Sequence, residues 1–101
     1  MIFVIEVVQS ATFAKWLSKL DDRRARARIQ VRIDRLALGN PGDVKPVGQG
    51  VSEMRIDYGP GYRVYFMQRG PFIVVLLCAG TKSTQRADVR RAIDIAESWR
   101  D

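Results

Sequence analysis

The first third of the chain combines one apolar run with segments in which apolar residues recur at helical spacing. Residues 1–8 are β-branched or apolar with a single charge at Glu6, a pattern that predicts a first strand. Ser10 or Thr12 is then placed to cap a short helix. The apolar stripe of this helix is formed by residues three or four positions apart, Phe13, Trp16, Leu17 and Leu20.

A second and longer helix is predicted from the acidic pair Asp21 and Asp22 to Leu38. Carboxylates suit a helix start because they accept hydrogen bonds from free N–H groups and lie at the positive end of the helix dipole. Gly39 supplies a C-terminal stop, with Pro41 just beyond it. The two helices are therefore expected to form a hairpin. The buried face of the second helix is assigned to Ala25, Ile29, Ile33 and Leu36.

From residue 41 to 50 the composition shifts to Gly, Pro and polar residues, which predicts a loop. The pattern then becomes alternating, so residues 51–57 and 62–68 are expected to be strands joined by a YGPG turn. The run 72–80 is apolar on both faces and should be the central, most buried strand. Three strands with short turns imply an antiparallel meander.

The tail carries apolar residues at helical spacing and predicts a closing helix. The whole order is then β-α-α-β-β-β-α, which belongs to the α+β class, because the helices are grouped away from a run of strands. We expect a small antiparallel sheet with an N-terminal helical hairpin and a C-terminal helix. A length of 101 residues favours one domain spanning 1–101.

Charge and composition narrow the function. The 17 Lys and Arg against 11 Asp and Glu give a net charge of +6, which favours a polyanionic partner, with nucleic acid as the leading candidate. A ribosomal surface, an acidic protein partner and plain solubility are the alternative interpretations. The chain has no His, and its single Cys78 lies in an apolar run, so neither a zinc site nor a Ser-His-Asp triad can be assembled. No metal and no cofactor are expected.

The sequence also predicts the compartment. A lone Cys78 excludes an intrachain disulfide and fits a reducing environment. The N-terminal residues lack the positive leader and cleavage pattern of a signal peptide, and the longest apolar stretch, residues 72–80, is too short to span a bilayer. We therefore expect a soluble, cytoplasmic protein that has no membrane contact.

Alternation along the strands suggests where chemistry takes place. If the Met54 and Ile56 face packs under helices, then the opposite face is open, and cross-strand neighbours bring together Glu53, Arg55, Arg63 and Tyr65. Lys45 and Lys82 are expected to flank this surface. Cleavage of RNA by its own 2′-hydroxyl needs cations for the phosphate oxygens, a proton acceptor and a proton donor. Solvated cross-strand pairs are the alternative interpretation of the same pattern.

Individual roles follow from side-chain chemistry. Arginine holds phosphate but stays protonated, so the general base is open between Glu53, Lys45 and Lys82. The ring of Tyr65 is a candidate platform for an unpaired base. Arg24 and Arg28 recur on one flank of the second helix and predict contact with RNA phosphates or with an acidic partner segment, although such flanks are commonly only solvated.

Several segments, in this order and spacing, resemble a known family: FAKWLSKLDD, ARARIQVRIDRLALGN, GDVKPVGQGVSEMRIDYGPGYRVYF and LLCAGTKSTQRADVRRA. Covering roughly residues 13–92, they resemble the phage-derived, Gp49-like HigB branch of the RelE/ParE toxin superfamily, also described as addiction-module killer proteins. The resemblance implies a RelE-like fold and a metal-independent endoribonuclease, an mRNA interferase, that cuts mRNA on the ribosome and so inhibits translation. It also implies a neighbouring helix-turn-helix antitoxin, HigA-like, that neutralises the toxin and represses the operon with it.

The same resemblance carries over three residues. Arg63 of GYRVYF matches the phosphate-binding arginine of the family, Arg55 of EMRI a basic position on the preceding strand, and Lys82 the basic residue after the buried strand. Two alternatives fit the same features. One is a non-catalytic module that binds RNA or the ribosome. The other is an inactive toxin that acts as a subunit of an antitoxin–repressor complex, which the absence of tyrosine after Thr81 favours.

Overall fold

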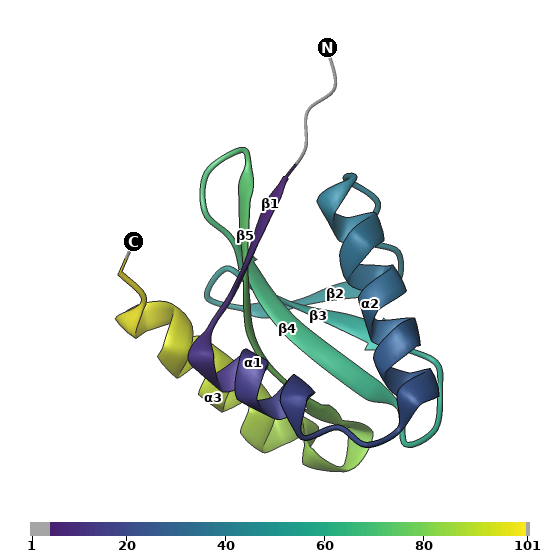
Figure 1. Cartoon of the computed structure of the whole chain (residues 1–101). Helices are drawn as coiled ribbons and strands as arrows, with labels where there is room; N and C mark the ends of the chain where they lie inside the picture. The colour runs from purple at the N-terminus through teal and green to yellow at the C-terminus, as the bar shows by residue number, and fades with distance from the viewer. Residues whose placement is uncertain (1–4, 101) are drawn as a thin grey trace.

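The computed structural model describes residues 5–100, which form an α+β structure of five strands and three α-helices (Figure 1). The predicted class and most predicted elements are confirmed. The predicted first strand began at Met1, and its first four residues lie outside the described part. In chain order the elements are β1 (Glu6–Gln9), α1 (Ala11–Ser18), α2 (Arg23–Ala37), β2 (Val44–Gly48), β3 (Val51–Ile56), β4 (Tyr62–Gln68), β5 (Ile73–Thr81), a 3-10 turn (Lys82–Thr84) and α3 (Gln85–Ser98).

The two helix starts show how local sequence sets these boundaries. The hydroxyl of Ser10 accepts a hydrogen bond from the Phe13 N–H and caps α1. The carboxylate of Asp22 accepts bonds from the Arg24 and Ala25 N–H groups and caps α2. Both caps were among the predicted candidates, because a short polar side chain before an apolar stripe is a local signal.

The sheet is mixed, with strand order β1-β5-β4-β3-β2. The predicted meander of β3, β4 and β5 is confirmed, but β1 runs parallel to β5, so the expectation of a purely antiparallel sheet is wrong. The expectation of a loop over residues 41–50 is also wrong, since β2 lies there and pairs with β3. Gly and Pro concealed this strand. An edge strand tolerates Pro46 because one side of its backbone needs no partner.

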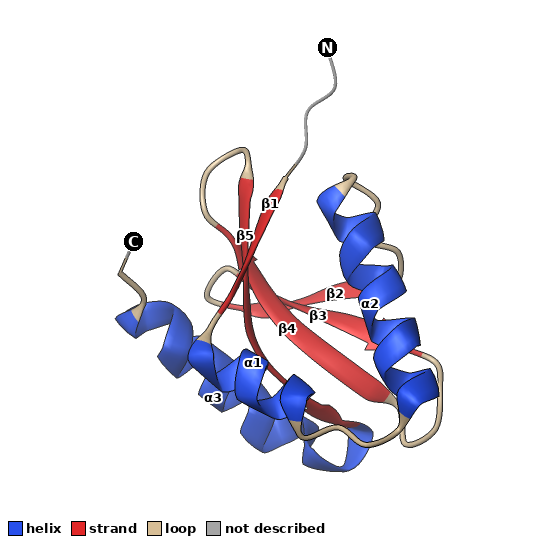
Figure 2. Ribbon diagram, in the orientation of Figure 1, coloured by secondary structure: helices blue, strands red, loops and turns tan. Residues whose placement is uncertain are grey.

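Helices cover both faces of the sheet (Figure 2). α1 and α2 pack on one face, where Phe13 and Ile29 join the side chains of Met54 and Val64. The predicted hairpin between these two helices is wrong: α1 packs mainly on β5 and β1, whereas α2 packs on β1 and β3, and the helices diverge (Figure 1). Each apolar stripe is buried against strands rather than against the other helix.

α3 packs on the opposite face and covers most of the surface predicted to be open. Its Ala92, with Val89 and Ile93, lies against a second core cluster that includes Tyr65 and Leu77. The alternation of β3 and β4 was predicted correctly, but the face that carries Glu53 and Tyr65 is buried. Only the end of this face, at Arg55 and Arg63, extends beyond the helix. None of the helices in residues 5–100 is long and apolar enough to cross a membrane.

Candidate functional site

Two arginines lie directly opposite each other where β3 and β4 emerge from under α3. Arg55 and Arg63 are register partners, a like-charge pairing that is unfavourable unless each cation is compensated. Arg55 Nη2 forms an ion pair of 2.8 Å with Asp43 Oδ1, and Arg63 Nη1 donates a 2.7 Å hydrogen bond to the Gly61 carbonyl. The Arg55 side chain is 41% exposed and that of Arg63 is 12% exposed, so both retain access to solvent.

These arginines line a hollow of about 490 Å³ together with Lys82. The β3–β4 turn forms its rim, and the Lys82 N–H donates a 3.4 Å hydrogen bond to the Pro60 carbonyl, which connects the end of β5 to this turn. The structure therefore brings together the three cations predicted from sequence. Two carboxylates, Asp43 and Asp57, complete the lining, so that three positive charges face two negative ones.

Gly61 makes the arrangement of Arg63 possible. Its φ of +77° is unfavourable for a residue with a side chain, and a Cβ there would lie 2.8 Å from Arg63 Nη1. The glycine thus gives the turn its shape and leaves room for the guanidinium to reach the Gly61 carbonyl.

A buried carboxylate stands behind Arg63. Glu53 is 0% exposed, and its Oε2 accepts hydrogen bonds from the Tyr65 hydroxyl at 3.0 Å and from the Gln85 amide of α3 at 2.9 Å. Its other oxygen, Oε1, has no hydrogen-bond partner and lies 3.9 Å from Arg63 Nε, which also lacks one. The carboxylate therefore acts on Arg63 as a fixed counter-charge that orients the guanidinium.

Two sequence predictions are corrected by this network. Glu53, a candidate general base, and Tyr65, a candidate stacking platform, are both 0% exposed and cannot touch a bound substrate in this structure. Burial, followed by the neighbouring Glu53 charge, raises the pKa of the Tyr65 phenol, so that it stays protonated as a donor. The strand pattern correctly predicted that Glu53 and Tyr65 share one face of the sheet, but it did not predict that α3 covers this face.

The α2 side continues the basic surface. A groove of about 640 Å³ is lined by four arginines of α2, and it shares Ile56 and Asp57 with the hollow, so the two are contiguous. The predicted contacts Arg24 and Arg28 both lie in this groove. Arg28 also stacks over the Tyr58 ring, 4.8 Å from its centroid.

The remaining predicted residue lies elsewhere. Lys45 is exposed on β2, opposite Glu53 in the strand register, and does not line the hollow. Conversely, sequence reasoning did not assign roles to Asp43 and Asp57. Asp57 follows the alternation of β3 and was recognisable from it, whereas Asp43 lay in the presumed loop. Within residues 5–100, no group of three or more His, Cys, Asp or Glu side chains is placed to hold a metal ion.

Comparison with known proteins places the chain in a family. Residues 15–100 match the family described as phage-derived protein Gp49-like, which is associated with the toxins of toxin–antitoxin systems. The chain is also 48% identical over 93 residues to an uncharacterized protein of Haemophilus influenzae, an alignment that covers 92% of this chain and 94% of that protein. Because both similarities extend over most of the chain, it belongs to the phage-derived Gp49-like family.

Proposed function

We propose that this protein is a HigB-type toxin of the RelE superfamily, an endoribonuclease that cuts mRNA during translation. The observation that carries the proposal is the meeting of Arg55, Arg63 and Lys82 around one open hollow at the end of the sheet. These three cations come from the ends of three different strands. Binding of a single phosphodiester explains why they line one hollow, whereas exposure to solvent alone does not require them to lie together.

The side chains of the hollow suit cleavage by internal attack. Arg55 and Arg63 hold the two non-bridging phosphate oxygens and stabilise the charge that develops on them. The exposed carboxylate of Asp57 accepts the proton of the 2′-hydroxyl, and the 2′-oxygen attacks phosphorus. The bond from phosphorus to the 5′-oxygen breaks, and the Lys82 ammonium donates a proton to that oxygen. The products are a 2′,3′-cyclic phosphate and a 5′-hydroxyl.

Of the three candidate bases, Glu53, Lys45 and Lys82, we keep only Lys82 in proton transfer, as the donor, on two grounds. It lines the hollow, whereas Glu53 is buried and Lys45 lies outside it. An ammonium group also serves naturally as the proton donor, which leaves the acceptor role to a carboxylate. The contiguous α2 groove, with Arg24 and Arg28, then holds the adjoining RNA or the ribosome through phosphate contacts.

The family association supports a partner as well. We propose that a helix-turn-helix antitoxin encoded beside this protein neutralises it, in a cytoplasmic complex that involves neither a membrane nor a metal. A reading frame of that kind immediately adjacent to this one, and co-purification of its product, are the direct tests.

Induced expression with mapping of mRNA 5′ ends tests the activity. The wild type should arrest growth and produce new ends within translated codons. Lys82→Gln and Arg63→Gln should each reduce cleavage by about 100-fold or more, because each removes a charge that acts on the transition state. Lys82 is exposed, so its substitution separates chemistry from folding.

Arg26→Gln is the matched control, since it removes an exposed arginine that lines neither the hollow nor the groove. Undiminished cleavage by a folded Lys82→Gln or Arg63→Gln protein would refute the assigned chemistry. Growth arrest without new mRNA ends would favour a non-catalytic ribosome binder, and wild-type expression without arrest would favour an inactive repressor subunit.

A further inference from the structure

A second basic pocket lies along the edge of β5 that faces away from β4, between α1 and α3. It has a volume of about 430 Å³, and none of the residues assigned to the hollow lines it. Its position follows from the strand pairing: β1 ends at Gln9, opposite Leu76, so the rest of β5 has no strand on that side. Cys78 and Ala79 both line the pocket although they face opposite sides of the sheet, which places it at this free edge.

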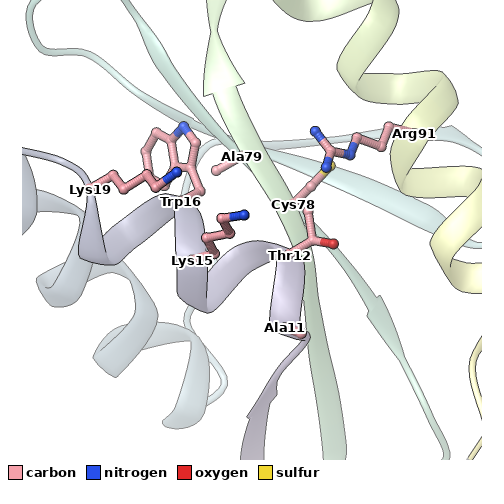
Figure 3. A pocket seen from close by; sticks show the side chains of 8 residues that line it. All are labelled: Ala11, Thr12, Lys15, Trp16, Lys19, Cys78, Ala79 and Arg91. Carbon is pink, nitrogen blue, oxygen red and sulfur yellow. The ribbon is translucent and has the colours of Figure 1, made fainter.

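The lining is cationic without a compensating acid. Lys15 comes from α1, Lys19 is the C-cap residue that follows this helix, and Arg91 comes from α3 (Figure 3). Figure 3 shows Lys15 and Arg91 on either side of β5, with Cys78 between them. No carboxylate lines the pocket, and within residues 5–100 none of these three cations forms an ion pair. Three exposed cations therefore line one pocket with a floor of small residues, and in residues 5–100 none of them is within ion-pair distance of a carboxylate.

An aromatic ring forms one wall. Trp16 is partly exposed, and its indole is held in place by Phe13, 6.2 Å between ring centroids, and by the edge of Tyr62 at 6.0 Å. Exposed cations beside a fixed indole match a phosphate joined to a planar base, because the cations pair with the phosphate oxygens and the indole stacks on the base.

We propose that this pocket is a second nucleotide-binding subsite, in which Lys15, Lys19 and Arg91 hold a backbone phosphate of single-stranded RNA and Trp16 contacts the adjoining base. The assignment rests on the proposed function for its ligand class, RNA, but not for cleavage. Asp and Glu side chains of a peptide offer carboxylates to the same cations but no ring to stack on Trp16, whereas one nucleotide supplies both groups, so the aromatic wall favours the nucleotide.

Trp16 fluorescence provides the test. In a Trp99→Phe background the indole of Trp16 is the sole tryptophan signal, and the probe is a 2′-O-methylated single-stranded hexanucleotide that cannot be cleaved by internal attack. Binding should change the emission of Trp16. Joint substitution of Lys15, Lys19 and Arg91 by Gln should abolish this change, weaken binding at least tenfold, and lower the salt slope of log K by about 0.7, since one phosphate contact is lost.

The matched control removes three exposed arginines that line neither the pocket nor the hollow, Arg23, Arg26 and Arg100. This control should keep the emission change. Arg63→Gln should also keep it while losing cleavage, so the pocket assignment survives if no cleavage is ever found. An unchanged Trp16 signal, or full affinity in the pocket variant while cleavage is intact, would overturn the assignment alone. A hexaglutamate peptide that reproduces the emission change when the hexanucleotide does not would overturn it in favour of a protein partner.

Discussion

Two arginine–carboxylate pairs involve neighbouring arginines on one face of β3 and β4. Arg63 and Glu53 lie 3.9 Å apart, with the carboxylate fully buried, whereas Arg55 and Asp43 lie 2.8 Å apart and are 41% and 58% exposed. The shorter pair is the weaker contributor to stability, because exposed pairs are screened by water and typically contribute about 0–1 kcal/mol. The longer pair includes a charge that cannot be left buried without partners.

The strand pattern predicted one surface for both pairs, but the two pairs have different roles: one positions Arg63, and the other leaves Arg55 available to a ligand. The Glu53 side belongs to the core under α3 and fixes where Arg63 lies, whereas the Arg55 side belongs to the hollow and remains free to exchange Asp43 for a ligand. A substitution on the first side should therefore act through stability, and one on the second side through binding.

Removal of the buried carboxylate should have the largest effect on stability. Glu53→Ala leaves the Tyr65 hydroxyl and the Gln85 amide without their acceptor, and we expect a loss of about 3–5 kcal/mol, as for breaking a buried pair. Urea unfolding followed by circular dichroism measures it. Asp43→Ala is the comparison and should change the unfolding free energy by less than about 1 kcal/mol. Equal losses from the two substitutions would contradict the distinction.

The same contrast separates what could be predicted from the sequence, which is local, from what could not, which depends on tertiary packing. Alternation placed Glu53, Arg55, Arg63 and Tyr65 on one face because the direction of a strand side chain is a local property. The position of α3 over that face depends on its packing against Leu77 and Tyr65, which is a tertiary property. The convergence of Lys82 with the two arginines was predicted from its place after the buried strand and from the family resemblance. The participation of Asp43 was not predicted, because Gly and Pro made β2 look like a loop.

Tyr65→Phe should have the next largest effect. It removes the hydrogen bond to Glu53 Oε2 while keeping the ring, so we expect a loss of about 2 kcal/mol near neutral pH. The folded-state pKa of Tyr65 is raised above its ordinary value of about 10, chiefly by burial. Stability from this shift is complete below about pH 10 and is lost above it, because the unfolded chain then binds fewer protons than the folded one.

The pH dependence is measured as the unfolding free energy at about pH 8 and about pH 11. Burial also raises the pKa of the Cys78 thiol, to about 12, so the comparison is made in a Cys78→Ala background. The parent should lose more stability between the two pH values than the Tyr65→Phe variant does. Parallel losses in the two proteins would mean that Tyr65 does not titrate differently on folding.

Gly61→Ala probes the junction between the two pairs. The positive φ at this position makes alanine unfavourable by about 1 kcal/mol, and the new Cβ would contact the guanidinium of Arg63. Cleavage should fall further than this small loss of stability explains, since Arg63 must move from its position over the hollow. Gly59→Ala is the control, because it also has a positive φ but its Cβ would approach only the Tyr62 ring, at 3.8 Å.

The smallest change in stability, and the sharpest test of the exposed pair, is expected for Asp43→Asn. The amide keeps the shape of the carboxylate, so the unfolding free energy should change by less than about 0.5 kcal/mol. The hollow loses one of its two negative charges and Arg55 loses its ionic partner, so RNA should bind a few-fold more tightly in a salt-sensitive manner. Binding of an uncleavable oligonucleotide at several salt concentrations measures this, with Asp34→Asn on the exposed part of α2 as the control for charge alone. If both variants gain the same affinity, the effect comes from net charge. Asp43 then does not compete with a phosphate for Arg55.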